Sequence, residues 1–473
     1  MCKIKINDEV LFAEKGELLS DILIRNGKSV EHPCGGRGTC RKCKVLVDGR
    51  EELSCQYRVV GDVSVSLFTQ GEIQSETGAE IKDEITDNMC FCLDIGTTTL
   101  ALALVSLDTG NVLKVETSTN PQCIFGADIM TRIDYCRKNG IEKLQSVLVE
   151  KINEMIDDFN ISKPLDMYVS ANVTMLHTLF NVDCSSIGVS PYKADFLESK
   201  MEKGENIGLT KVGNVISLPS IHSFVGADIV AGMNYISNPK NDKYNLLVDL
   251  GTNAEIVLYS NDSAICTSTA AGPCFEGANI SCGMSATDGA IYKFSRRNGQ
   301  IELETINKKN PRGICGTGLV DIFAELLDKE IDKTGFMEED FKIYGNIVMN
   351  QSDVRQFQLA KSAVYSGIIT LINLERIDFE QIEKLYISGG FSAKINIENA
   401  VKVGLFPQEL QEKCVAINNS SLLGTVKFAY EKNNLNSYVE KAKYADLSTN
   451  MEFSDLFIKN MKFGGEDNEK NEV

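Results

Sequence analysis

Residues 91–104 have the sequence FCLDIGTTTLALAL, and residues 246–258 have the related sequence LLVDLGTNAEIVL. In each copy an apolar run leads into Asp-x-Gly-Thr or its close variant, and a second apolar run follows. This is the pattern of two strands joined by a tight turn. The copies agree in length, in apolar pattern and in the position of the glycine. We interpret them as an internal repeat, which predicts two similar lobes.

The turn in each copy suits a nucleotide phosphate. Glycine lets the backbone approach phosphate oxygens, threonine hydroxyls and backbone N–H groups donate to them, and an aspartate can hold hydrated Mg²⁺. We therefore predict that the lobes bind ATP and Mg²⁺ between them and that Asp94 and Asp249 are the catalytic residues. The phosphate ligands are predicted to be Gly96, Thr97, Thr98 and Thr99 in the first turn and Gly251, Thr252 and Asn253 in the second.

One such turn alone is weak evidence, because Asp-Gly turns are common in surface hairpins. Two further glycine-rich segments strengthen the prediction, GICGTG at residues 313–318 and SGGF at residues 388–391, the latter after a strand-like run. The four segments together resemble the ATPase superfamily of actin, the sugar kinases and Hsp70, in which the last glycine pair lies against the adenosine. The resemblance implies further nucleotide contacts by Gly316, Thr317, Gly318, Gly389, Gly390 and Phe391.

A cysteine motif precedes this region, in the sequence PCGGRGTCRKCKVLVDGREELSC at residues 33–55. Gaps of five, two and eleven residues separate its four cysteines, which resembles the plant-type ferredoxin motif with one extra residue in the first gap. We predict one 2Fe-2S cluster on Cys34, Cys40, Cys43 and Cys55. A structural zinc site is the alternative, since four thiolates also bind zinc, but zinc sites usually use paired short spacings.

The order of these motifs predicts the domains. Residues 1–69 alternate like a hairpin, continue as a short helix and end with the cysteine motif, so we expect a β-grasp, ferredoxin-like domain. Residues 70–88 are acidic and polar, as in a linker. Residues 89–464 alternate strand-like and helical runs, so we expect an α/β, two-lobed ATPase domain with lobes at roughly 89–245 and 246–464. Residues 465–473 are expected to be disordered.

Composition excludes several classes of protein. The chain has 48 Lys and Arg against 66 Asp and Glu, and its formal net charge of -18 disfavours nucleic acid as a partner. No apolar run approaches the length of a membrane span and no signal peptide is apparent, so we expect no membrane partner and a cytoplasmic location. Fifteen cysteines, an odd number in a large chain, argue against a disulfide framework.

A ferredoxin domain joined to this ATPase fold resembles the reductive activators of corrinoid-dependent enzymes. The resemblance covers most of the chain, although members of that family usually carry a longer middle region than residues 70–88 provide. It also rests on strings that turn chemistry does not require, namely Asn120-Pro121-Gln122, Phe125-Gly126-Ala127-Asp128, residues 172–177, Phe224-Val225-Gly226-Ala227-Asp228, Ala271-Gly272-Pro273, Phe275-Glu276-Gly277-Ala278-Asn279 and Gln358-Leu359-Ala360-Lys361.

The resemblance implies a function. Such activators return an oxidised corrinoid from Co(II) to the Co(I) state that methyl transfer requires, so the expected partners are the corrinoid protein of a methyltransferase system and a low-potential electron donor or reductase. An uphill gap of 100 mV costs about 2.3 kcal/mol per electron. ATP binding and hydrolysis would change the cleft between the lobes and make the transfer favourable.

Two other functions fit the same motifs. One is a small-molecule kinase of the same superfamily, in which the ferredoxin domain is a redox sensor. The other is an Hsp70-like assembly factor that loads cofactor into a corrinoid protein. The sequence also leaves open whether the chain forms a homodimer.

Overall fold

The computed structural model describes residues 1–6, 9–26, 28, 38, 43–67, 78–82, 86–126, 128–236, 238–240, 242–390 and 392–463. Three predicted site residues, Cys34, Cys40 and Phe391, lie outside the described residues, as does the predicted tail at 465–473. No helix in the described ranges is both long and apolar enough to cross a membrane.

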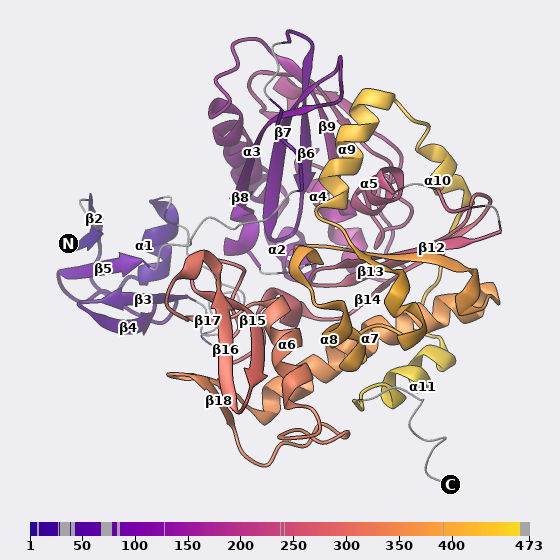
Figure 1. Ribbon diagram of the computed structural model, residues 1–473. Helices are drawn as coiled ribbons and strands as arrows, with labels where there is room; N and C mark the ends of the chain where they lie inside the picture. The colour runs from indigo at the N-terminus through magenta and orange to yellow at the C-terminus, as the bar shows by residue number, and fades with distance from the viewer. Residues whose placement is uncertain are drawn as a thin grey trace.

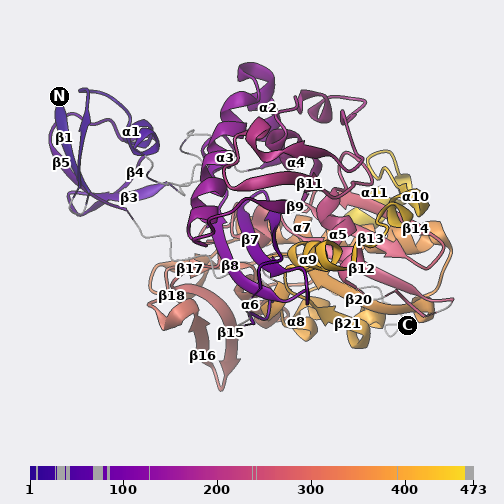
Figure 2. The same cartoon turned by 90° about the horizontal axis from the view of Figure 1, so that it is seen from above.

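The N-terminal domain is a five-stranded mixed sheet covered by one helix, and it stands apart from the rest of the chain (Figures 1 and 2). Alternating residues such as Ile4 and Ile6 point inward and meet Leu19 and Ile22 of the helix. The predicted β-grasp, ferredoxin-like fold is confirmed. In sheet order the strands are β2 (Glu9–Ala13), β1 (Cys2–Ile6), β5 (Val63–Leu67), β3 (Lys44–Val47) and β4 (Arg50–Leu53), and the helix is α1 (Leu19–Arg25).

Two six-stranded sheets form the rest of the chain, and each contains one copy of the repeat. The strand order is β10-β11-β9-β6-β7-β8 in the first and β21-β20-β12-β13-β14-β22 in the second. The first sheet consists of β6 (Met89–Ile95), β7 (Thr99–Ser106), β8 (Val112–Thr119), β9 (Leu165–Ala171), β10 (Met201–Lys203) and β11 (Val212–Ser217); the second consists of β12 (Tyr244–Leu250), β13 (Ala254–Tyr259), β14 (Ala264–Thr269), β20 (Ile382–Ser388), β21 (Cys414–Ala416) and β22 (Ala442–Tyr444).

Five strands of each sheet share one arrangement. In the first sheet β11, β9 and β6 are parallel while β7 and β8 follow antiparallel. In the second, β21, β20 and β12 are parallel while β13 and β14 follow antiparallel. The strands of the repeat, β6 with β7 and β12 with β13, therefore occupy equivalent places. This confirms the internal repeat and the two-lobed fold.

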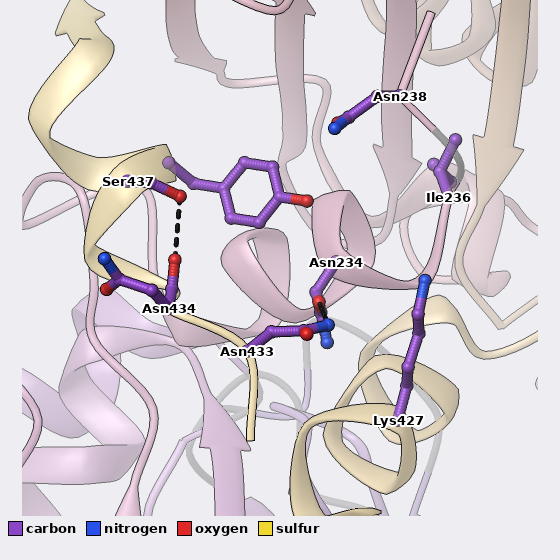
Figure 3. A pocket seen from close by; sticks show the side chains of 8 residues that line it. Asn234, Ile236, Asn238, Lys427, Asn433, Asn434 and Ser437 are labelled. Atoms are coloured by element: carbon purple, nitrogen blue, oxygen red, sulfur yellow. Dashed lines mark hydrogen bonds between the residues drawn. The ribbon is translucent and has the colours of Figure 1, made fainter. Parts of the chain in front are cut away.

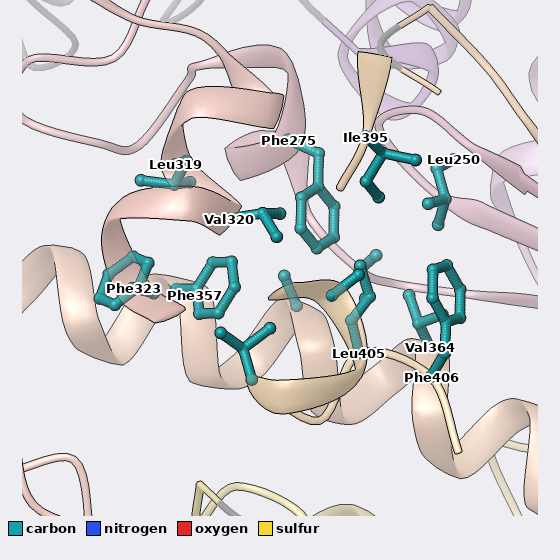
Figure 4. Packing of buried hydrophobic residues seen from close by; sticks show 14 of the residues in the cluster. Leu250, Phe275, Leu319, Val320, Phe323, Phe357, Val364, Ile395, Leu405 and Phe406 are labelled. Carbon is teal, nitrogen blue, oxygen red and sulfur yellow. The ribbon is translucent and has the colours of Figure 1, made fainter. Parts of the chain in front are cut away.

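Helices cover both sheets. In the first lobe α2 (Ile129–Asn139), α3 (Glu142–Asp157), α4 (Val173–Leu179) and α5 (Ala227–Tyr235) surround the sheet. The second lobe has the larger core, where Phe323 stacks on Phe357 and Phe275 meets Phe357 edge to face (Figure 4). Its helices are α6 (Gly316–Leu326), α7 (Gln351–Glu375), α8 (Ile397–Lys402) and α11 (Met451–Lys459). It also has two small sheets. One consists of β15 (Ala290–Arg297), β16 (Gln300–Thr305) and β17 (Gly313–Ile314), and the other of β18 (Phe341–Tyr344) and β19 (Ile347–Met349).

One helix crosses between the lobes. Helix α9 (Ser420–Glu431) follows five of the six strands of the second sheet in sequence, but it packs on β6 and β9 of the first sheet and beside α5 (Figures 1 and 2). Its Leu422, Val426 and Ala429 belong to the core of the first lobe. Helix α9, which in sequence falls within the rough bounds 246–464 predicted for the second lobe, thus packs with the first lobe. Helix α10 (Asn436–Lys441) then leads back to β22 at the edge of the second sheet.

The string Gln358-Leu359-Ala360-Lys361 lies on α7 and holds the segment that follows α11. Gln358 Nε2 donates to the Met461 carbonyl at 2.6 Å, and Lys361 Nζ donates to the carbonyls of Asn460 at 2.5 Å and Lys462 at 2.6 Å. Burial lowers the pKa of Lys361 to about 7. The role of this string in the described structure is to fix the C-terminal segment, and it lies outside the phosphate turns.

Candidate functional site

The two predicted phosphate turns are hairpins at equivalent ends of the two sheets. Gly96 N donates to Thr99 O at 2.9 Å, and Gly251 N donates to Asn253 O at 2.9 Å. A side chain at position 96 would place its Cβ 2.7 Å from the Thr99 carbonyl, so this turn requires glycine. At position 251 a Cβ would lie 3.7 Å from Glu276 Oε1, which is ordinary van der Waals contact, so this turn does not require glycine for space.

Asp94 lies at the end of β6, where the start of α9 holds it. Asn419 Nδ2 and Ser421 Oγ donate to its two carboxylate oxygens, each at 2.7 Å. Burial raises the pKa of Asp94, while these two hydrogen bonds oppose the rise. Both oxygens are thus fixed before any ligand binds.

Asp249 and Asp228 bring further negative charge to the same place. Burial, and then the charge of Asp94, raises the pKa of Asp249 to about 6. Burial, and then the charge of Asp249, raises the pKa of Asp228 to about 7. Carboxylates from both lobes therefore repel one another here, and a divalent cation would relieve that repulsion. In the described ranges no three Asp, Glu, His or Cys side chains are grouped as ligands of a metal ion.

The raised pKa of Asp228 predicts a pH-dependent stability. Between the unfolded pKa of about 3.9 and the folded pKa of about 7, the folded state binds more protons than the unfolded state, so rising pH destabilises the fold. We expect Asp228→Asn to match the wild type at pH 4 and to be increasingly more stable from pH 5 to 8. Urea unfolding at several pH values measures this, and a constant difference across the range would contradict it.

Two buried side chains brace the first hairpin from behind. Asn120 N donates to Thr98 O at 2.8 Å and its Nδ2 donates to Gly96 O at 2.8 Å. Arg132 of α2 donates from Nη2 to Thr97 O at 2.7 Å and from Nε to Gly126 O at 2.9 Å. Burial lowers the pKa of Arg132 to about 10. The strings that begin at Asn120 and Phe125 are thus explained by the support of the phosphate turn.

We expect Arg132→Met to destabilise the protein and loosen this hairpin. The change leaves the Thr97 and Gly126 carbonyls without their donor in a buried site, which costs about 1–3 kcal/mol for each group. Urea unfolding should show a loss of several kcal/mol, together with weaker ATP binding. Arg137→Met is the matched control, because Arg137 lies on the same helix, is exposed and pairs only with Asp134. Equal effects of the two changes would contradict the bracing role.

The remaining threonines of the first hairpin differ in their partners. Asn172, the N-cap of α4, donates from Nδ2 to Thr97 Oγ1 at 3.4 Å. Thr98 Oγ1 lies 3.5 Å from Glu276 Oε2, and Thr252 Oγ1 of the second hairpin donates to the same oxygen at 2.7 Å. Glu276 therefore joins the two hairpins. Sequence reasoning missed it, although its string at residues 275–279 was noted as a mark of the family.

The two other glycine-rich segments lie at the second lobe. Thr317 Oγ1 at the start of α6 donates to Tyr292 O at 2.9 Å, and a Cβ at Gly318 would lie 2.1 Å from Ile291 O, so both residues serve the packing of α6. Gly389 has a φ of +108°, and a Cβ there would lie 2.1 Å from Leu250 O beside the second hairpin. Nothing lies within 4 Å of a Cβ at Gly390. The nucleotide contacts of Gly316, Thr317, Gly318, Gly389 and Gly390 stay a prediction.

The cluster ligands that the structure describes come together through a hairpin. Cys43 precedes β3 and Cys55 follows β4, whose pairing of Lys44 with Leu53 brings the two sulfurs to 3.1 Å. Both cysteines are buried, and burial raises the pKa of Cys43 to about 11. The eleven-residue gap in the motif is thus one hairpin. Two sulfurs that converge on one point fit two ligands of a single iron-sulfur cluster.

A pocket of about 340 Å³ lies away from the hairpins, between the ends of α5 and α9 and the start of α10 (Figure 3). Its lining is polar, and Asn433 Nδ2 donates to Asn234 Oδ1 within it at 2.9 Å. None of the predicted site residues lines it. The lining residues are Asn234, Ile236, Asn238, Lys427, Asn433, Asn434, Ser437 and Tyr438.

Comparison with known protein families assigns each part of the chain. Residues 4–62 match the 2Fe-2S iron-sulfur cluster binding domain, residues 89–238 match the RACo middle region, and residues 243–472 match the C-terminal domain of RACo, the ASKHA domain. The N-terminal domain is therefore a 2Fe-2S domain. The middle region, which residues 70–88 were too short to contain, is present and coincides with the first lobe.

Individual proteins agree with these matches. The chain is 30% identical over 414 residues to the corrinoid activation enzyme RamQ of Eubacterium limosum, covering 78% of this chain and 70% of RamQ. It is 28% identical over 399 residues to the [Co(II) methylated amine-specific corrinoid protein] reductase of Methanosarcina barkeri, covering 74% and 72%.

A solved structure supports the same fold. The reductive activator for corrinoid, iron-sulfur protein superposes with a TM-score of 0.72 over 98% of both chains at 24% identity. The cysteine pair, the duplicated hairpins, the three matching regions and the relatives all agree. The chain belongs to the RACo family of reductive activators of corrinoid-dependent enzymes.

Proposed function

We propose that this protein is an ATP-dependent reductive activator that passes an electron from its 2Fe-2S cluster to the Co(II) corrinoid of a methyltransferase-associated corrinoid protein and restores Co(I). The observation that carries the proposal is the union, on one chain, of a 2Fe-2S domain and two Asp-x-Gly-Thr hairpins that Glu276 joins across the lobes. The relative from Methanosarcina barkeri is named as a reductase of a Co(II) corrinoid protein, which supports the same reaction here.

Each part of the chain has a task in this reaction. Cys43 and Cys55, with Cys34 and Cys40 from the same motif, would hold the cluster, which supplies one electron at a time when bound. The hairpins would bind the phosphates of ATP, and Asp94 and Asp249 would hold hydrated Mg²⁺ against them. Because the cobalt step is uphill by about 2.3 kcal/mol for each 100 mV, ATP must favour the transfer.

The structure offers a route between the hairpins and the linker. Residues 418–421 lie where α9 begins: Asn419 and Ser421 hold Asp94, and Ser420 Oγ lies 2.7 Å from Ser388 Oγ, next to the glycine pair. This segment therefore touches both lobes. It also contacts the linker, because Gly78 lies so close to Asn418 that a Cβ at position 78 would be 2.3 Å from its Nδ2. A movement of this segment on ATP binding would reach the chain that leads to the cluster domain.

We expect Gly78→Ala to weaken this link without damaging either active part. Gly78 has a φ of +69°, and the added methyl group must displace Asn418. Iron content and basal ATP hydrolysis should stay near the wild type, while ATP-driven cobalt reduction falls by about tenfold or more. Gly345→Ala is the control, since Gly345 also has a positive φ but has no neighbour within 4 Å of the built Cβ. Full cobalt reduction by the Gly78 variant would contradict the coupling.

The test of the proposed function is an anaerobic mixture of this protein, a low-potential reductant, MgATP and the corrinoid protein encoded nearest to it. We expect the Co(II) absorbance to disappear and that of Co(I) to appear only when ATP is present. If the cluster and ATP hydrolysis are intact but no corrinoid protein of the organism is reduced, the proposal fails. Phosphorylation of a small molecule would instead identify a kinase, and activity without the cluster would identify an assembly factor. The proposal includes a cytoplasmic location and a low-potential electron donor. Measuring the molecular mass in solution would show whether the chain forms a homodimer.

A further inference from the structure

Glu276 lies between the two phosphate hairpins and belongs to neither. It is the last residue of the short 3-10 helix η4 (Pro273–Glu276), after β14 of the second sheet. Its Oε2 accepts a hydrogen bond of 2.7 Å from Thr252 Oγ1 and lies 3.5 Å from Thr98 Oγ1. One carboxylate oxygen therefore receives the hydroxyls of both hairpins, one from each lobe.

Those hydroxyls are the donors that the hairpins would offer to a phosphate. A threonine hydroxyl has a single hydrogen, so it cannot donate to Glu276 and to a phosphate oxygen at the same time. A carboxylate also resembles a phosphate in charge and in its acceptor oxygens. In this structure Glu276 thus makes contacts that a phosphate would otherwise make.

The backbone around Glu276 is held firmly. Phe275 packs among the aromatic rings of the second core (Figure 4). Gly277 has a φ of +78°, and a Cβ there would lie 2.3 Å from Met284 O. Glu276 can therefore leave the hairpins only by turning its side chain, and a small rotation decides whether the hydroxyls are free.

Burial raises the pKa of Glu276. The hydrogen bonds from Thr252 and Thr98, and then the charge of Arg132, oppose this rise. Negative charge is already dense at this place: burial first, and then the charges of Asp94 and Glu276, raise the pKa of Asp249. A nucleotide phosphate that approached Glu276 would meet both repulsion and occupied donors.

We infer that Glu276 occupies the place of the terminal phosphate of ATP when the cleft is empty, and that ATP must displace its carboxylate from Thr98 and Thr252 in order to bind. The inference rests on the proposed ATP function and assigns Glu276 as a positioning residue. By holding the two hairpins together it closes the empty site. By competing with the terminal phosphate, Glu276 weakens nucleotide binding. Its displacement by that phosphate breaks the contact between the two hairpins, so the arrangement of the lobes depends on whether ATP is bound.

The test is the affinity of the purified, cluster-containing protein for a non-hydrolysable ATP analogue and for ADP, both with Mg²⁺, by titration calorimetry. Glu276→Ala should bind the ATP analogue about tenfold more tightly than the wild type, since a hydrogen bond to a charged group no longer opposes it. ADP, which lacks the terminal phosphate, should gain much less. Glu276→Gln removes the charge at nearly constant shape and should show a smaller gain in the same direction.

Glu255→Gln is the matched control. Glu255 lies near Asp228 and Asp249, so its charge belongs to the same acidic group, but its carboxylate accepts from Ser268 at 3.0 Å and does not touch the hairpin hydroxyls. An equal gain in the Glu255 variant would mean that the effect is only general repulsion, and it would overturn the inference. Unchanged or weaker analogue binding in both folded Glu276 variants would overturn it as well.

A third variant separates this role from action on the attacking water. Thr252→Val removes the main donor to Glu276. In the double variant, which carries Glu276→Ala and Thr252→Val, the change in the binding free energy of the analogue should therefore differ from the sum of the changes in the two single variants. If Glu276→Ala instead binds the analogue as the wild type does and loses only hydrolysis, Glu276 acts on water and the inference is wrong. Because these measurements use neither cobalt nor a partner, they can fail while the proposed reductase activity stands, and the reverse also holds.

Discussion

Replacing Cys43 with alanine should remove the 2Fe-2S cluster and abolish cobalt reduction, while ATP hydrolysis continues. Cys43 is buried, and its sulfur lies 3.1 Å from that of Cys55, as expected of two ligands of one cluster. The cluster domain has its own core, separate from the cores of the lobes, and its loss should leave nucleotide binding intact.

Iron and sulfide analysis measures this directly: the anaerobic wild type should contain about two irons and two sulfides per chain, and the variant none. Cys2→Ala is the matched control, because Cys2 is also buried in this domain but lies outside the motif. The control should keep its cluster. Stoichiometric zinc in the wild type, or cobalt reduction by the Cys43 variant, would contradict the assignment.

The second large effect concerns the two aspartates of the repeat. Asp94→Asn and Asp249→Asn should each lower ATP hydrolysis by about a hundredfold or more, because phosphoryl transfer depends mainly on positioning and on the neutralisation of charge by Mg²⁺. Asp94 is the better placed of the two before ATP binds, since Asn419 and Ser421 already hold both of its oxygens.

Asp321→Asn is the control for these variants. Asp321 is a buried aspartate of α6 that accepts from Asn399 Nδ2 and from Phe294 N, and its pKa is also raised by burial. Its replacement should leave hydrolysis within a few-fold of the wild type. Hydrolysis that persists at the wild-type rate in both the Asp94 and the Asp249 variants would remove the hairpins from the active site.

The sequence was sufficient for features that a local pattern encodes. The hairpins at Asp94 and Asp249 were found because their strands, turn and glycine recur at two places, and turn chemistry explains each of those residues. Cys43 and Cys55 could be placed together because the eleven residues between them form one hairpin, while Cys34 and Cys40 stay predictions. The β-grasp domain and the two lobes follow from these local patterns.

What the sequence did not reveal are contacts between distant residues. Asn419 and Ser421 reach Asp94 across more than 300 residues, and nothing in their own surroundings marks them as partners of a carboxylate. Arg132 has the sequence context of an ordinary helix surface, yet it is fully buried. Glu276 follows a glycine-rich turn that has no periodic pattern. The family strings around Asn120, Phe125 and Phe275 lie close to Arg132 and Glu276 in sequence, but they did not indicate what those residues do.

The return of α9 to the first lobe also bears on how the protein is made. All six strands of the first sheet have been translated by residue 217, but the helix that covers part of their apolar face spans Ser420–Glu431, behind nearly the whole second sheet. Domains usually fold as units, from the N-terminus onward, while the ribosome is still working. Here the surface of the first lobe that packs against Leu422 and Val426 stays uncovered until most of the second lobe has left the ribosome. The order in which the first lobe is synthesised therefore differs from the order in which its core can be completed.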